Sequence, residues 1–266
     1  MKNILVLMHD DAGQEARFQA AVDLTRGLEG HLRCIDVAMV PPFVGDYLEF
    51  GGGAALLADE QTREAANRVR MEARLKGEDL LYDWVDATGL ARDCLRDAAA
   101  LADLVVLNRE LDKVDYPDMR DLICDTILKT GKPIVAVPET MLGFDLYGHA
   151  VVAWDGSRPA EAALQAAVSL LKHAGTVTLL VVDEGQLRLP AAEAAEYLSR
   201  HGIRPEVRMV PKTDTVAGAI LGVVEALKAA YLVMGGFGHS RFLEAAFGGV
   251  TRRMLAESPI PLVLAH

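Results

Sequence analysis

The sequence predicts an α/β protein made of two tandem Rossmann-like doubly wound domains, each with a five-stranded parallel sheet. Two observations support this fold class. Short apolar runs alternate with longer helical patterns along the whole chain. The chain also repeats itself: a shift of 146 positions aligns residues 15–24 with residues 161–170, and seven of these ten positions are identical. Two copies of one unit are therefore expected.

In the first half, five apolar runs are expected to form strands. They are Asn3–Met8, Leu32–Val37, Leu81–Asp86, Leu104–Leu107 and Ile134–Val137. Helices are expected between them, most clearly over 55–76, which is rich in Ala, Glu and Arg without Pro or Gly, and over 90–101. Strands of unbroken Val, Ile and Leu joined by helices are typical of a parallel sheet covered on both faces. Right-handed crossovers would then place a ligand crevice at the carboxyl ends of the strands.

The second half is expected to repeat this order of elements. A strand over 149–154 is followed by the turn Asp155-Gly156-Ser157 and a helix over 161–173. The connection 139–148 is short, so the predicted domains span residues 1–140 and 148–266. We expect the last strands of the two halves, 134–137 and 261–264, to form the seam of an intramolecular pairing, because uncovered edge strands invite uncontrolled association.

Composition limits the classes of partner. The chain has 266 residues, of which 51% are apolar and 24% charged, as in well-packed globular proteins. Its formal net charge of −11 argues against nonspecific binding to nucleic acid or to an anionic membrane. No apolar run approaches the roughly 20 residues of a membrane-spanning helix. We therefore expect a cytoplasmic protein without nucleic-acid or membrane partners.

The segment 235–251, GGFGHSRFLEAAFGGVT, contains the strongest functional signal. An apolar strand leads into Gly235, two residues separate Gly235 from Gly238, and nine more precede Gly248. Glycine can adopt positive φ and lets a ligand approach the backbone closely, while the free N–H groups of a helix that begins near Gly248 and Gly249 attract anions. The pattern predicts a phosphate site. The alternative is a glycine-rich connection without a ligand.

This pattern resembles the G-x2-G-x9-G-[S/T] signature of the universal stress protein family, whose ATP-binding members use it for ribose and phosphates. Gly249 departs from the signature, which has Ser or Thr there, and Thr251 could offer a hydroxyl instead. The resemblance also implies that Asp155, at the tip of its strand, contacts the nucleoside. Its alternative roles are those of a helix cap or a turn residue.

The resemblance thus implies a set of nucleotide-binding residues: Asp155, Gly235, Gly238, His239, Gly248, Gly249, Val250 and Thr251. The expected ligand is ATP, or ADP or AMP, accompanied by Mg²⁺. His239 could donate to a phosphate oxygen or lie in solvent. No catalytic triad and no His/Cys metal spacing is legible, so we predict no catalytic residue, no protein-held metal, and at most weak ATP hydrolysis.

The first half does not keep this chemistry. The repeat places His9 opposite Asp155, Asn108 opposite Gly235, Leu111 opposite Gly238 and Arg120 opposite Gly248. We therefore expect a degenerate nucleotide site in the first half, which would serve as a pairing partner. The segment 41–53 is expected to be a loop, with an interaction surface or lid as the alternative.

The resemblance implies a tandem universal stress protein, an ATP-binding regulatory protein of the stress response with one competent site, and a homodimer as a further option. Two alternatives stay open. One is a non-binding scaffold that acts through dimerisation and protein partners. The other is an adenine-nucleotide hydrolase of similar fold, which is disfavoured because WDGSRPA, at residues 154–160, lacks a glycine-rich phosphate loop.

Overall fold

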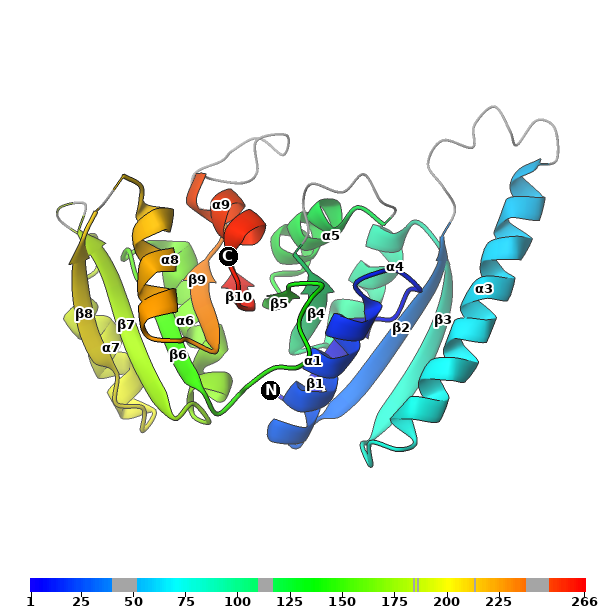
Figure 1. Ribbon diagram of the computed structural model, residues 1–266, viewed down its shortest axis with the longest axis horizontal. Helices are drawn as coiled ribbons and strands as arrows, with labels where there is room; N and C mark the ends of the chain where they lie inside the picture. The colour runs from blue at the N-terminus through cyan, green and yellow to red at the C-terminus, as the bar shows by residue number, and fades with distance from the viewer. Residues whose placement is uncertain (40–51, 110–116, 184, 186, 213, 238–248) are drawn as a thin grey trace.

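The computed structural model describes residues 1–39, 52–109, 117–183, 185, 187–212, 214–237 and 249–266. These residues form one mixed sheet covered by helices, with the strand order β3-β2-β1-β4-β5-β10-β9-β6-β7-β8. Figure 1 shows β5 and β10 at the centre, with β3 and β8 at the outer edges. The predicted fold class is confirmed.

The elements follow the predicted alternation of strands and helices. The first half contains β1 (Asn3–Leu7), α1 (Gln14–Gly27), β2 (His31–Met39), α3 (Gly52–Leu75), β3 (Tyr82–Gly89), α4 (Ala91–Ala98), the short helix η1 (Ala99–Leu101), β4 (Leu104–Asn108), α5 (Met119–Asp125), the short helix η2 (Thr126–Thr130) and β5 (Ile134–Val137). The second half contains β6 (His149–Ala153), α6 (Arg158–Leu171), β7 (Thr176–Asp183), α7 (Ala191–Arg200), β8 (Glu206–Pro211), α8 (Val216–Ala226), β9 (Tyr231–Gly235), α9 (Gly249–Glu257) and β10 (Leu262–Ala265). The bounds of β1 and β6 differ by the 146 positions of the repeat.

The strands within each half are parallel, and the two halves meet in an antiparallel pair. Leu262, Val263 and Leu264 of β10 lie opposite Ala136, Val135 and Ile134 of β5. The sheet therefore continues across the junction, and neither strand is left as an open edge.

Alternating strand residues supply two apolar cores, one on each face of the sheet. In β1, Ile4 and Val6 belong to the core under α1, α3, α6 and α7, while Leu5 and Leu7 belong to the core under α4, α5, α8 and α9. All four of these side chains are fully buried. Each face is thus covered by helices from both halves, as the apolar strand sequences require.

Further contacts join the halves. The connection between them packs its own side chains, since Phe144 and Leu146 are buried, and the Phe144 N–H donates to Asp23 Oδ2 of α1 at 2.8 Å. Arg109 follows β4, and its guanidinium donates to the carbonyl oxygens of Leu255 and Ala256 at 2.6 and 2.9 Å. A side chain of the first half thereby satisfies carbonyls in the last turn of α9.

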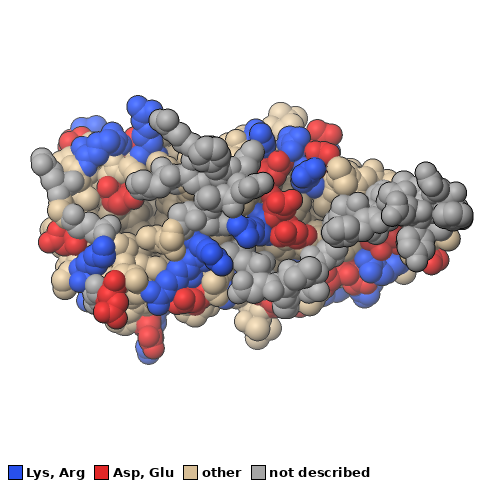
Figure 2. Space-filling view, turned by 90° about the horizontal axis from the view of Figure 1, so that it is seen from above, with Lys and Arg blue, Asp and Glu red and all other residues tan. Residues whose placement is uncertain are grey.

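The carboxyl ends of the outer strands β2, β3, β7 and β8 lie toward the top of Figure 1 and therefore face the viewer of Figure 2. Basic and acidic side chains lie close to one another on this face in both halves, despite the net charge of −11. In the described part of the chain, no helix has both the length and the apolar character needed to cross a membrane.

Candidate functional site

A cleft of about 260 Å³ lies at the carboxyl ends of β6, β7 and β9. The topology explains its position. β6 and β9 are neighbours in the sheet, but the chain continues from β6 to α6 on one face and from β9 to α9 on the other. Connections that leave adjacent strands in opposite directions open a crevice between them, which is where doubly wound sheets bind ligands.

The wall of the cleft is largely apolar. Leu180 and Val182 come from the end of β7, Val216 and Ile220 from α8, and Met234 from β9. The polar groups come from the turn before α6, which includes Asp155 and Ser157, and from the backbone of Gly235 and the first turn of α9. Such a lining can accept a flat apolar ring while a few polar groups fix its orientation.

Asp155 lies in a turn and lines the cleft. Its Oδ1 accepts a hydrogen bond from the Ser157 N–H at 2.9 Å, and its side chain is exposed. The N-cap of α6 is Ser157, whose Oγ accepts from the Ala160 N–H at 3.3 Å. Asp155 is therefore a turn residue and not the cap of α6; these were the two alternatives to contact with a ligand. The carboxylate remains accessible from the cleft.

Gly235 is required here for close packing. The glycine spacing predicted positive φ at this loop, and that prediction is wrong for Gly235, whose φ is not positive. A Cβ at this position would lie 2.5 Å from the Ala160 backbone nitrogen and 2.6 Å from the Pro159 carbonyl carbon. The absence of a side chain lets the end of β9 approach the first turn of α6.

The first turn of α9 completes the cleft with Gly249, Val250 and Thr251. The first N–H groups of a helix have no partner within the helix, so they can donate to an anion. A Cβ at Gly249 would meet no atom within 4 Å, whereas Thr251 is buried.

The structure thus gathers five of the eight predicted residues around one cleft: Asp155, Gly235, Gly249, Val250 and Thr251. Gly238, His239 and Gly248 lie outside the described residues. Sequence reasoning missed the wall formed by Val182, Val216 and Ile220, since apolar residues at the end of a strand and on a helix carry no signal that separates a ligand pocket from a core.

The first half has a buried polar network at the carboxyl ends of β1 and β4. Arg17, which aligns with Ala163 of the second half, is fully buried. Its Nε donates to the Leu7 carbonyl at 2.7 Å, and Nη1 and Nη2 donate to the two carboxylate oxygens of Asp11, each at 2.9 Å. Arg17 also donates to Asn108 Oδ1.

Asn108 and Gly13 mirror the close contact of Gly235 with Pro159. The repeat aligns Gly13 with Pro159 and Asn108 with Gly235, so the glycine has changed sides. A Cβ on Gly13 would overlap the Asn108 side chain, just as a Cβ on Gly235 would overlap the start of α6. Arg120 lies in α5, and Leu111 is outside the described residues. The first half therefore keeps the architecture but has Arg17 and Asn108, joined by a hydrogen bond, where the second half has Ala163 and Gly235.

Comparison with protein families identifies the second half. Residues 146–266 match the model of the Universal stress protein family. The second half is a universal stress protein domain. The match includes every described residue that lines the cleft, from Ala153 to Thr251.

Solved structures show the same fold over the whole chain. A universal stress protein from Archaeoglobus fulgidus DSM 4304 superposes with a TM-score of 0.75 at 14% identity, and the match covers 98% of this chain and 97% of the other. A functionally unknown protein from Pseudomonas aeruginosa PAO1 gives a TM-score of 0.59 at 13% identity over 100% and 92% of the two chains. No curated protein matches the chain. The first half therefore has the same α/β fold as the second.

Proposed function

We propose that the universal stress protein domain of the second half binds one adenine nucleotide in the cleft, with ATP as the main ligand and ADP or AMP as alternatives. The main support for this proposal is that three separate parts of the chain come together in the folded protein. Asp155, the glycine end of β9 and the N-terminus of α9 meet at one cleft, although Asp155 lies far from the other two in the sequence.

Each part of the nucleotide has a chemically suited wall. The adenine ring would pack against Val182, Val216 and Ile220, which are the apolar surface of the cleft. The Asp155 carboxylate is an acceptor for ribose hydroxyls. The phosphates would lie at the first turn of α9, where backbone N–H groups and the Thr251 hydroxyl are the available donors. Mg²⁺ would accompany the phosphates.

One site per chain follows from the contrast between the halves. Arg17 and Asn108 stand where the second half has Ala163 and Gly235, and a nucleotide bound at this place would disturb a fully buried guanidinium that is paired with Asp11. Breaking such a buried pair typically costs about 3–5 kcal/mol, which a nucleotide would have to offset before it gained any affinity. A regulatory role in the stress response, a homodimer and a cytoplasmic location stay predictions from the sequence.

The experiment is calorimetric titration of the purified protein with ATP, ADP, AMP and adenosine, each with and without Mg²⁺. We expect one bound nucleotide per chain, confirmed by mass spectrometry of the denatured protein. Asp155→Ala should weaken ATP and adenosine by similar factors, because it removes a nucleoside contact and leaves the phosphate donors intact.

Asp145→Ala is the matched control. Asp145 is also exposed and accepts from the backbone N–H two residues ahead, that of Tyr147 at 3.1 Å, but it lies in the connection between the halves and away from the cleft. Both substitutions remove the same kind of side-chain hydrogen bond within a turn. The two positions differ in that Asp155 lines the cleft and Asp145 does not. If the folded protein binds none of the four ligands, the proposal fails and the non-binding scaffold takes its place.

A further inference from the structure

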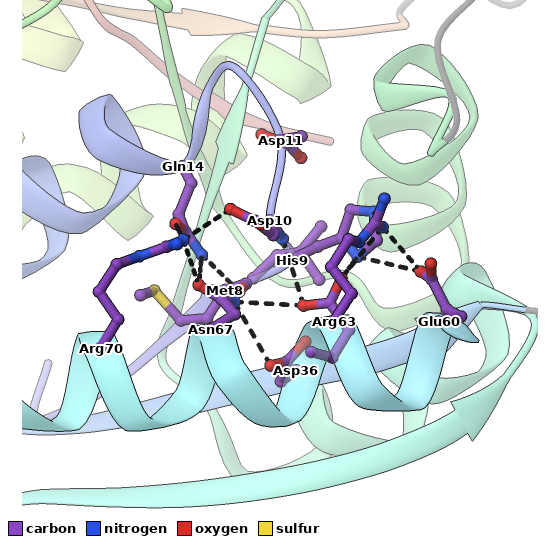
Figure 3. A network of polar contacts seen from close by, with 12 residues as sticks. Met8, His9, Asp10, Asp11, Gln14, Asp36, Glu60, Arg63, Asn67 and Arg70 are labelled. Carbon is purple, nitrogen blue, oxygen red and sulfur yellow. Dashed lines mark hydrogen bonds and ion pairs between the residues drawn. The ribbon is translucent and has the colours of Figure 1, made fainter. Parts of the chain in front are cut away.

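Three potential metal ligands converge in the first half, outside the nucleotide cleft. His9 follows β1, Asp36 lies in β2 and Glu64 lies in α3. One ligand atom from each residue lies within 4.8 Å of the other two. Figure 3 shows His9 and Asp36 between the end of β1 and the side of α3 that faces the sheet.

All three side chains are removed from water. The exposed fractions are 2% for His9, 2% for Asp36 and 5% for Glu64. Within the described residues, Asp36 Oδ1 is buried without a hydrogen-bond partner. A buried carboxylate oxygen without a donor is costly, and it marks a place where a cation or an added donor would be stabilising.

Two buried carboxyl groups share this space. Burial, together with the neighbouring Glu64, raises the pKa of Asp36 to about 9. Burial also opposes ionisation of Glu64, but contacts with His9, Asp36 and Arg63 outweigh it and lower the pKa of Glu64 to about 2.

The surroundings supply a fourth oxygen and a mobile counter-charge. Glu60 Oε1 lies 3.9 Å from His9 Nδ1, while Glu64 Oε1 lies 2.9 Å from it. Arg63 contacts Glu60 at 2.9 Å, Glu64 at 3.1 Å and His9 Nε2 at 3.3 Å, yet its side chain is 47% exposed. Arg63 can therefore move into solvent. Asn67 donates to Glu64 Oε2 at 3.2 Å and holds this carboxylate in place.

We propose that His9, Asp36 and Glu64 bind a divalent first-row transition-metal ion, with Glu60 within reach as a fourth ligand. One imidazole and two or three carboxylates are a donor set that suits Zn²⁺ and Mn²⁺. Ligands at about 2.1 Å from one ion lie at most about 4.2 Å apart. His9 Nδ1 and Glu64 Oε1, at 2.9 Å, already meet this limit, and any pair near the 4.8 Å bound would have to approach by roughly half an ångström. Zn²⁺ should bind more tightly than Mn²⁺, in line with the general order of divalent affinities.

The site has a specific place in the repeat. His9 aligns with Asp155, so the first half would hold a metal ion next to the position that the second half uses for a nucleoside. The ion would also tie α3 to β1 and β2. The proposal does not depend on the proposed nucleotide site, because no residue of the cluster lines that cleft.

The test uses tag-free, nucleotide-free protein that has been dialysed against EDTA and then against metal-free buffer. Mn²⁺ binding is followed by electron paramagnetic resonance, and Zn²⁺ is added as a competitor. We expect one Mn²⁺ per chain, displaced by one Zn²⁺. Asp36→Asn and Glu64→Gln keep the side-chain shape and should each weaken binding at least about tenfold, since losing even an outer-shell partner costs about 10–100-fold.

The matched controls are His31→Gln and Asp83→Asn. His31 and Asp83 form a 2.7 Å ion pair in the same half, on β2 and β3, but their side chains are 42% and 46% exposed. These variants remove the same residue types from outside the cluster and should bind Mn²⁺ like the wild type.

Arg63→Gln provides a test that structural damage cannot imitate. It removes the cation that competes for Glu60 and Glu64, so Mn²⁺ should bind roughly 3–10-fold more tightly at this partly screened position. Circular dichroism in EDTA checks the fold of each variant. The proposal is overturned if the wild type binds neither ion, or if Asp36→Asn and Glu64→Gln bind as tightly as the wild type. It is also overturned if Arg63→Gln fails to strengthen binding.

Discussion

Gly235→Ala should destabilise the second half and damage the cleft together. The added Cβ would lie 2.5 Å from the Ala160 nitrogen, 2.6 Å from the Pro159 carbonyl carbon and 2.9 Å from the Pro159 Cβ. Two of these are backbone atoms, which cannot rotate away as a flexible side chain could. The clash can be relieved only if β9 and the start of α6 separate.

The expected cost lies at the upper end of the range for overpacking a core, about 3 kcal/mol, which lowers the melting temperature by roughly 6–12 °C. ATP affinity should fall at least about tenfold because the displaced turn carries Asp155 and Ser157, and a misplacement of about 1 Å is enough to impair a site. The measurements are urea denaturation, thermal melting by circular dichroism, and calorimetric titration with ATP.

Gly249→Ala is the control for the loss of a glycine as such. A Cβ there would meet nothing within 4 Å, so stability should change by less than about 1 kcal/mol. If Gly235→Ala melts within about 2 °C of the wild type and binds ATP equally well, the close approach of β9 to α6 is not a constraint. Our account of this glycine would then be refuted.

Two further predictions concern the first half. Arg17→Met removes the buried partner of Asp11 and should lower the free energy of unfolding by about 3–5 kcal/mol. Denaturant titration measures this loss, and an unchanged midpoint would contradict a structural role for Arg17. The hydrogen bonds from Arg74 are the main reason that the pKa of Glu15 is lowered to about 2. The pair therefore stabilises the fold above the ordinary pKa of about 4.5, and this stabilisation is lost as the pH falls toward 2. Glu15→Gln should therefore lower the free energy of unfolding by less than about 1 kcal/mol at pH 7, because the pair is half-exposed. The difference in stability from the wild type should shrink between pH 4.5 and pH 2. A difference that grows on acidification would contradict this assignment.

Local sequence patterns predicted the elements well because each depends on neighbouring residues. The strand 134–137 was placed at its observed bounds, and the helix expected over 55–76 is α3, at 52–75. The predicted helix over 90–101 is α4 followed by the short helix η1. Amphipathic helices carry a 3.6-residue periodicity, and buried strands are short unbroken apolar runs between turn residues, so no knowledge of distant contacts is needed.

The side-chain chemistry of the two sites could be predicted only in part. Asp155 and Gly249 belonged to a recognisable spacing, whereas Val216 and Ile220 are ordinary apolar positions of α8 until the fold brings them beside β9. The His9, Asp36 and Glu64 cluster was missed for the same reason, since its members lie on three separate elements without a metal-binding spacing. Such sites depend on the topology of the sheet, which a one-dimensional pattern does not contain.

The exchanged glycines restrict how the two halves could have diverged. Gly13 faces Asn108 in one half, and Pro159 faces Gly235 in the other, so each contact has room for one side chain. A single substitution that puts side chains on both partners is blocked by steric overlap. Any stepwise route that avoids the overlap passes through an intermediate with glycine at both positions. This intermediate is less stable, because a second glycine loses more conformational freedom on folding and leaves the contact without a side chain. If the two halves descend from one duplicated unit with either contact, its divergence passed through such a less stable intermediate.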